Sequence, residues 1–121
     1  MKSKNRRIIL ENRLTEFQNR RQRLQNVVKK LDDLESELLF SESPNREKIM
    51  EIKTKVWKLF LMVESIIGTD ARIAFNMWQD QFEDDPIEAV TYPAYIISIF
   101  DLPRIEKLID FYHTALTNLS K

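Results

Sequence analysis

A single glycine, Gly68, and no cysteine occur among the 121 residues of the chain. Without cysteine there can be no disulfide framework and no thiolate metal site, and a reducing, cytoplasmic location is expected. One glycine cannot supply the turns that a β-rich fold needs. It also excludes the glycine-rich loops that hold nucleotide phosphates. The expected class is therefore all-α.

The chain also lacks a long apolar run. Its densest apolar stretch, residues 56–67, is interrupted by Lys58 and Glu64, whereas a membrane span needs about 20 apolar residues. The run Ile8–Leu10 stops at Glu11 and is too short for a signal peptide. We therefore expect no membrane partner.

Charge is balanced overall but divided unevenly along the chain. Residues 1–30 hold ten Lys or Arg against Glu11 and Glu16, a net charge of +8. Residues 31–121 hold nine Lys or Arg against seventeen Asp or Glu, a net charge of −8. Such asymmetry is typical of nucleic-acid contact, or of pairing between the basic end of one subunit and the acidic part of another.

A long first helix is predicted over residues 5–40, because no proline or glycine interrupts them. Apolar residues recur there at intervals of seven, at Leu10, Phe17, Leu24, Leu31 and Leu38. The second half adds Val27 and Leu34, which gives the three-four spacing of a coiled-coil seam. In the first half the companion apolar residue shifts to Leu14, and Arg13, Arg20 and Arg21 crowd the stripe.

Four prolines divide the rest of the chain. Ser43 and Pro44 are expected to cap and open a second helix, whose apolar residues surround it and place Trp57, Leu59, Phe60 and Val63 in the core. A break at Gly68 or a continuous helix through it are both compatible with the sequence, and a further helix should reach about Asp84. Asp85, Pro86 and Glu88 then form a cap, a first-turn proline and a capping-box acid.

Pro93 is expected to divide the next short helix, and Asp101 and Pro103 to open the last one. The last helix has one apolar face, made of Ile105, Leu108, Ile109, Tyr112, Leu116 and Leu119. We therefore predict a single domain over residues 1–121, with a coiled-coil-like basic helix over 5–40 and a bundle body over 44–121. The fold is a bundle of four to five helices, in which the short link after Phe40 makes the first two helices an antiparallel hairpin.

No residue set predicts catalysis, a metal or a cofactor. The acidic residues 80–88 match no calcium loop. Glu106, Asp110 and His113 lie at helical spacing, but a di-iron bundle needs a second such helix and more glutamates. The single histidine cannot be assigned to a nucleophile. We expect no enzyme activity, with clustered acids serving as solvated helix surface.

An uncovered end of the first helix is the main functional indication. The second helix is too short to cover the first dozen residues, so the last helix, a second subunit or a partner must do so. We expect an assembly or adaptor protein that self-associates, by default as a dimer, or binds a protein partner. The predicted interface residues are Ile8, Leu10, Leu14 and Phe17.

Accessory nucleic-acid binding by the same basic helix is the alternative hypothesis. The residues expected to contact phosphates are Arg6, Arg7, Arg13, Arg20, Arg21, Arg23, Lys29 and Lys30. A purely structural role is the competing interpretation, in which the arginine stems cover the apolar seam and the charges pair with acidic neighbours.

Overall fold

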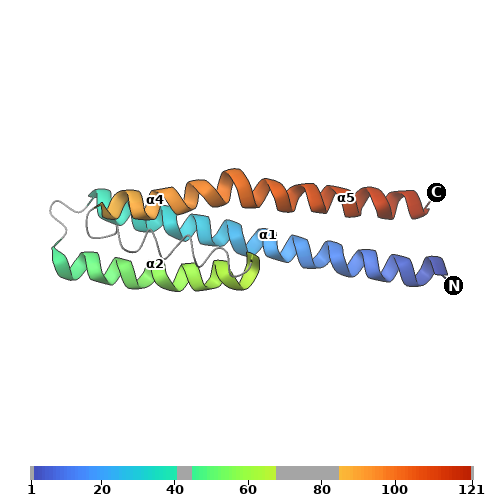
Figure 1. The fold of residues 1–121 in the computed structure, drawn as a ribbon, viewed down its shortest axis with the longest axis horizontal. Helices are drawn as coiled ribbons and strands as arrows, with labels where there is room; N and C mark the ends of the chain where they lie inside the picture. Colours follow the sequence, from blue (N-terminus) through green and yellow to red (C-terminus); the bar gives the residue numbers. More distant parts are fainter. Residues whose placement is uncertain (1, 41–44, 68–84, 121) are drawn as a thin grey trace.

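The described residues of the computed structural model, 2–40, 45–67 and 85–120, are helical apart from the caps Asn45 and Asp85. They form α1 (Lys2–Phe40), α2 (Arg46–Ile67), α4 (Pro86–Ile96), the π-helical segment η1 (Ile97–Asp101) and α5 (Leu102–Ser120) (Figure 1). The all-helical prediction is confirmed for these residues. The expected link after Phe40, the break at Gly68 and the helix before Asp84 lie outside them, as do Ser43 and Pro44.

The first helix follows the prediction closely. It begins at Lys2, three residues before the expected start, and ends at Phe40 as expected. With 39 residues at ~1.5 Å per residue it is roughly 58 Å long. Two rods of helix pack against it: α2 is one, and α4, η1 and α5 together form the other.

Side-chain caps define where α2 and α4 begin. The backbone N–H of Lys48 donates to Oδ1 of Asn45 at 2.8 Å, so Asn45 caps α2 and the prediction that Ser43 caps this helix is wrong. The N–H of Glu88 donates to Oδ1 of Asp85 at 3.1 Å, and Pro86 occupies the first turn of α4. Each cap satisfies an N–H that has no partner inside its helix. The predicted cap at Asp85 is confirmed.

The predicted helix boundaries at Pro93 and Asp101 are wrong, because α4, η1 and α5 form one continuous rod. Pro93 lies inside α4 and is buried. Before Pro103 the helix widens, and the N–H of Leu102 donates to the carbonyl oxygen of Ile97, five residues back. A proline ring clashes with the carbonyl four residues earlier, and a π-turn changes that register. The widened turn therefore lets the rod continue towards Ser120.

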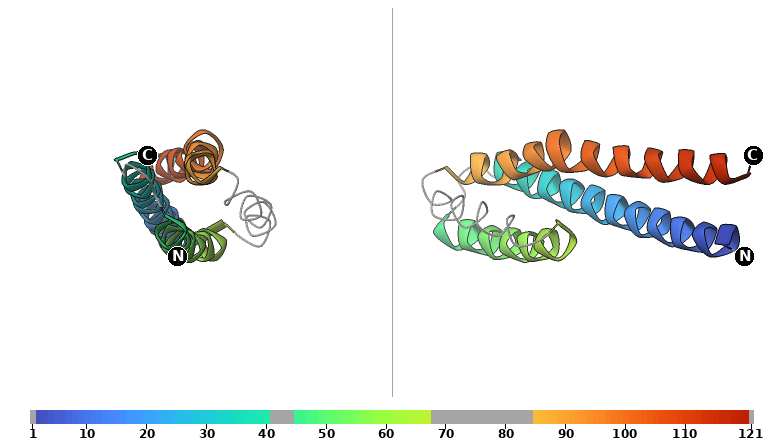
Figure 2. Two further views of the ribbon diagram at one scale, coloured as in Figure 1. Left: turned by 90° about the vertical axis from the view of Figure 1, so that its left-hand side faces the viewer. Right: turned by 45° about the vertical axis from the view of Figure 1, so that its right-hand side comes forward.

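Both rods run antiparallel to α1. Beside the second half of α1, Arg23 donates to Oγ of Ser65 at 3.2 Å and Lys48 Nζ lies 3.3 Å from Oε1 of Glu37. The rod of α4, η1 and α5 follows α1 along its length, so the N and C termini lie at the same end (Figures 1 and 2). The second half of α1 therefore lies next to two rods.

One apolar cluster joins the three rods. The side chains that are fully removed from solvent include Leu24, Val27, Leu31, Ile52, Val56, Val63, Val90 and Ile97. The predicted core positions Leu59, Phe60 and Val63 are buried in this cluster, and Trp57 is half-buried against it. The coiled-coil seam of α1 is thus the centre of the core.

Truncating Phe60 should strongly destabilise the fold. Its side chain is 3% exposed, so Phe60→Ala should cost about 3–5 kcal/mol, a large part of a domain's stability. Leu61, the next residue of α2, is 43% exposed, and Leu61→Ala should cost only about 0.5 kcal/mol. Urea denaturation followed by circular dichroism measures both. Equal losses in the two variants would contradict this assignment of the buried face.

Candidate functional site

Two helices project beyond the end of α2 and form an extension that we call the arm, residues 2–20 of α1 and 108–120 of α5 (Figures 1 and 2). α2 ends at Ile67, close to Arg23, where Ser65 accepts a hydrogen bond from its guanidinium. Within the described part of the chain, α5 is the helix that packs along the first half of α1. Among the helices that the structure describes, the arm therefore has two to bury its apolar side chains.

The seam of the arm is closed within the chain. The rings of Phe17 and Tyr112 stack with centroids 5.7 Å apart and planes 16° from parallel. Leu14 is buried, as are Ile105 and Ile109 of α5. The apolar face of the last helix, which includes Tyr112, therefore packs against the first half of α1. Of the three covers considered for this stripe, the last helix is the one that the structure contains.

The four predicted interface residues therefore differ in their surroundings. Leu14 and Phe17 pack in the seam against α5, and Leu10 is half-buried. Ile8 remains 47% exposed. The structure leaves the accessible apolar surface near the tip of the arm rather than along its whole length.

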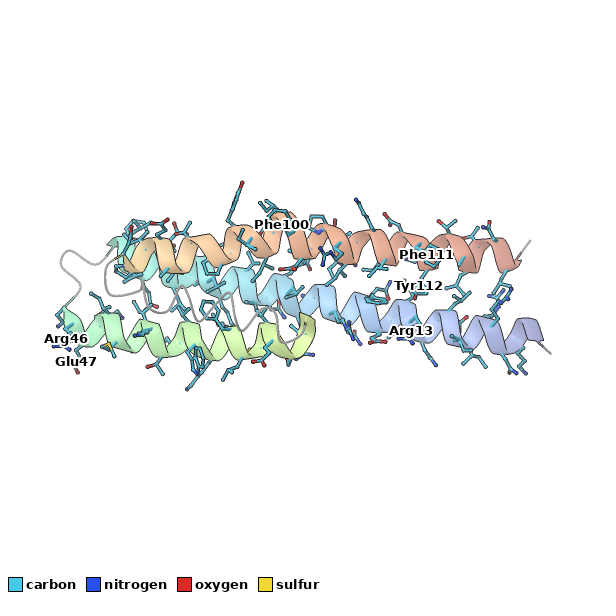
Figure 3. The ribbon with its side chains drawn as sticks, in the orientation of Figure 1. Arg13, Arg46, Glu47, Phe100, Phe111 and Tyr112 are labelled. Atoms are coloured by element: carbon cyan, nitrogen blue, oxygen red, sulfur yellow. The ribbon has the colours of Figure 1, made fainter. Side chains whose placement is uncertain are left out.

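Further exposed apolar side chains lie beside that surface. Ile9 is 60% exposed and Phe111 is 61% exposed, with its ring edge-on to that of Tyr112 at 5.3 Å (Figure 3). A cavity of ≈ 440 Å³ opens between the two helices, lined by Arg6, Leu10, Phe111, Ala115, Asn118 and Leu119. Phe111 could not be predicted from the apolar stripe of α5, because it lies outside that stripe. Its four-residue spacing from Ala115 was the available indication.

The basic residues of α1 follow the end of α2. Arg6, Arg13 and Arg20 are seven residues apart, and the same column continues with Val27 and Leu34, which are buried. Residues seven apart lie on the same side of a helix. The column is therefore apolar where α2 lies alongside and cationic where α2 is absent. This explains why arginines interrupt the stripe in the first half.

Two of these arginines already have partners. Glu16 Oε1 lies 2.6 Å from Nη2 of Arg20, and Glu16 Oε2 lies 3.5 Å from Nη1 of Arg13. The guanidinium of Arg20 also lies over the ring of Phe17, 5.3 Å from its centroid. Such contacts support a structural role for Arg20, whose stem and charge cover the seam.

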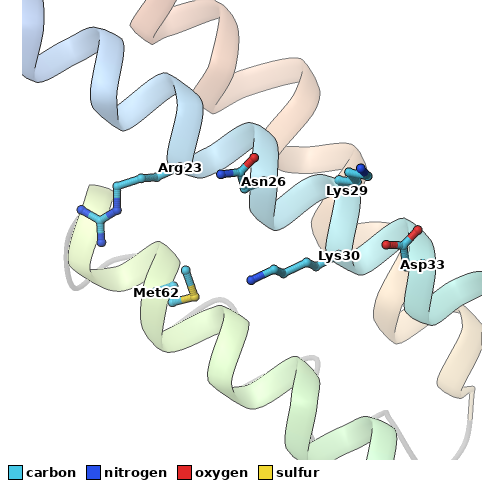
Figure 4. Close-up of a pocket in the computed structure, with 6 residues that line it drawn as sticks. All are labelled: Arg23, Asn26, Lys29, Lys30, Asp33 and Met62. Atoms are coloured by element: carbon cyan, nitrogen blue, oxygen red, sulfur yellow. The ribbon is translucent and has the colours of Figure 1, made fainter.

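A second basic group borders α2. Arg23, Lys29 and Lys30 line a cavity of ≈ 350 Å³ together with Asn26, Asp33 and Met62. Figure 4 shows Arg23 and Lys30 extending from α1 towards α2. Arg7 is exposed and Arg21 is half-buried, in the column that contains Leu14. The eight predicted phosphate contacts therefore divide among several sides of α1 and form no single surface.

The described residues offer no group of three or more His, Cys, Asp or Glu that could hold a metal ion. Glu106, Asp110 and His113 are exposed on α5. Asp80, Glu83 and Asp84 lie outside the described residues. Burial raises the pKa of Asp101, a residue of η1, above its ordinary value of 3.8, and the nearby charge of Arg104 opposes this effect. This partly buried carboxylate is therefore a cost in stability when it is ionised.

Replacing Asp101 should therefore stabilise the protein at neutral pH. A raised pKa in the folded state means that the folded state disfavours the ionised form, so its cost is present near pH 7 and disappears as pH falls below 3.8. Asp101→Asn should raise the free energy of unfolding near pH 7, with a gain that shrinks towards pH 3.8. Urea titrations at several pH values measure this. Asp110→Asn, at an exposed carboxyl of α5, is the control. A gain in the free energy of unfolding of Asp101→Asn that does not change with pH would contradict a raised pKa at Asp101.

No family model matches the chain, and neither a search of curated proteins nor one of solved structures finds a match. In the ranges that the structure describes, every helix is too short or too polar to cross a membrane. Function therefore has to be inferred from the surfaces of the arm and of α1.

Proposed function

We propose that this protein is a non-catalytic assembly or adaptor protein that self-associates or binds a protein partner through its arm. The observation that carries the proposal is the exposed apolar surface at the tip of the arm, where Ile8, Ile9 and Phe111 are each about half exposed or more and a cavity lined by Leu10 and Phe111 opens between the two helices. Fully burying one such side chain contributes roughly 1.5–3 kcal/mol. A contact covering Ile9 and Phe111 together with the cavity between them and Leu10 would therefore support specific binding.

The shape of the arm supports the same function. A groove between two packed helices accepts the apolar side of a third helix, with anchors at helical spacing. Leu10 on α1 and Ala115 and Leu119 on α5 line such a groove. Because Phe17 and Tyr112 already close the seam beneath it, the arm is preformed, which lowers the entropic cost of binding.

Self-association should raise the molar mass measured in solution above that of one chain. If the arm pairs with a second copy, light scattering at tens of micromolar will give more than the 14.5 kDa of one chain. Ile8→Glu with Ile9→Glu should restore the single-chain mass without loss of helical circular dichroism. Leu61→Glu, at an exposed leucine of α2, is the matched control and should leave the mass unchanged.

A single-chain mass for the wild type restricts the proposal to a foreign protein partner. Selection from a displayed library of helical peptides tests that form, with the Ile8→Glu, Ile9→Glu variant used for counter-selection. Binders that need the intact arm support the proposed function. A single-chain mass together with no arm-dependent binders contradicts it.

Nucleic-acid binding is a second candidate, favoured by the group of Arg23, Lys29 and Lys30 around one cavity. Here the contacts would be electrostatic and nearly independent of sequence, because counterion release dominates. The pairing of Arg13 and Arg20 with Glu16 reduces the charge left for phosphates. This candidate therefore relies on fewer of the predicted residues than the sequence suggested.

Salt dependence tests the second candidate. If six or more phosphates are contacted, affinity for a duplex oligonucleotide should fall by several orders of magnitude between about 50 and 200 mM salt. Lys29→Glu with Lys30→Glu should abolish binding to the oligonucleotide. The control Glu106→Lys, at an exposed residue of α5, should leave that binding in place. Fluorescence anisotropy and the 260/280 nm absorbance ratio of the purified protein provide the measurements. Absence of binding at the lower salt concentration eliminates this candidate.

A further inference from the structure

We propose that the groove of the arm binds an amphipathic helix of another protein, whose acidic residues face the arginines of α1. This inference rests on the proposed function, since it specifies the chemistry of the partner that docks on the arm. It depends on three features of the described residues: which columns of α1 are left uncovered, what lines the groove, and how charge is distributed over the arm.

The uncovered columns of α1 continue the line of α2. One column contains Arg23, Lys30 and Glu37, and each of them borders α2. Arg23 donates to Ser65, Lys30 lines a cavity with Met62, and Glu37 pairs with Lys48. Towards the N terminus the same column continues with Glu16 and Ile9. In the arm, this column and the column of Arg6 and Arg13 face a position that no described helix occupies. A partner helix placed there would extend the packing arrangement of α2.

The groove presents an apolar floor with a cationic edge. Arg6, Ile9, Leu10 and Arg13 lie at i, i+3, i+4 and i+7, so they share one side of α1. Opposite them, Phe111, Ala115 and Asn118 have helical spacing on α5 and carry no charge. A partner helix therefore meets apolar side chains in the middle and positive charge along the α1 edge.

Charge argues for a foreign helix rather than the arm of a second copy. Residues 2–20 hold six Lys or Arg against Glu11 and Glu16, and residues 108–120 add only the charge of Asp110, so the arm has a net charge of +3. Two such arms in contact would bring like charges within a Debye length, about 10 Å at 0.1 M salt. Acidic side chains spaced seven apart would instead face Arg6 and Arg13, which are ~10.5 Å apart along the axis.

Arg13 can meet such a partner despite its contact with Glu16. That pair is exposed, with N–O distance 3.5 Å, and exposed ion pairs contribute about 0–1 kcal/mol. Arg20 has the shorter contact with Glu16 and the ring of Phe17 beneath it, so it remains part of the seam. Arg6 and Arg13 are therefore the two recognition residues.

Two matched synthetic peptides test the partner chemistry. Both have 21 residues, with Leu at the a and d positions of three heptads; one has Glu at every flanking e and g position, and the other has Lys. Like-charge repulsion keeps each peptide from pairing with itself. By fluorescence anisotropy, the full-length protein should bind the Glu peptide at least tenfold more tightly than the Lys peptide.

Variants of the full chain assign that preference to the two arginines. Arg6→Glu with Arg13→Glu should reverse the preference, so that the Lys peptide binds more tightly. Lys55→Glu with Lys58→Glu, at exposed residues of α2, changes the net charge by the same amount away from the arm and should keep the preference of the wild type. Leu10→Glu should weaken the binding of both peptides, because it places a charge in the apolar floor of the groove. Circular dichroism checks that each variant remains helical.

Each failure identifies what was wrong. Arm-dependent binding of both peptides with equal affinity would overturn the acidic partner but leave the proposed docking function intact. No binding of either peptide, with a wild-type dimer that Ile8→Glu and Ile9→Glu dissociate, would show that a second copy occupies the groove. No peptide binding by a protein of single-chain mass would overturn the acidic-helix inference, and the library selection then decides the docking function separately.

Discussion

The apolar seam along α1 is the contact on which the rest of the described structure depends. Leu10, Phe17, Leu24, Leu31 and Leu38 place one apolar residue in every two turns, and both rods pack against this helix. The burial of this seam supplies the main favourable free energy of folding for a protein with no disulfide. The number of rods beside the seam differs between the two halves of α1, and this difference sets the chemistry of its surface.

In the second half, two rods share the seam. The columns of α1 beside it are either apolar or carry charges that pair with charges on α2. Val27 and Leu34 are buried, and Glu37 meets Lys48 of α2. In the first half only α5 accompanies α1 among the described helices, and the same columns carry Arg6, Arg13 and Glu16. Aliphatic residues there would have formed a larger exposed apolar patch, which soluble chains rarely carry without a partner. The combination of charge and remaining apolar surface is the basis on which we propose the arm as a docking surface.

The continuous rod of α4, η1 and α5 makes the arm possible. A helix that ended at Pro93 or restarted at Asp101 could have changed direction before reaching the first half of α1. The widened turn, in which the Leu102 N–H reaches the Ile97 carbonyl, keeps the chain in line. Phe17 and Tyr112 can stack only because this line is kept over the whole rod. The local backbone therefore decides where the termini of the molecule lie.

The sequence by itself determined the elements whose causes are local. Scarce glycine and helical periodicity gave the all-helical class, the uninterrupted run gave the extent of α1, and Asp85 with Pro86 gave the start of α4. The buried positions of α2 followed from its apolar residues in the same way. Only the tertiary structure decided which helix covers Leu14 and Phe17, because a periodic stripe shows that a face is buried and not by what. It also decided that Phe111 stays exposed beside the groove, and that the basic residues of α1 separate into distinct sides, since these outcomes depend on the register between α1 and α5 and on where α2 ends.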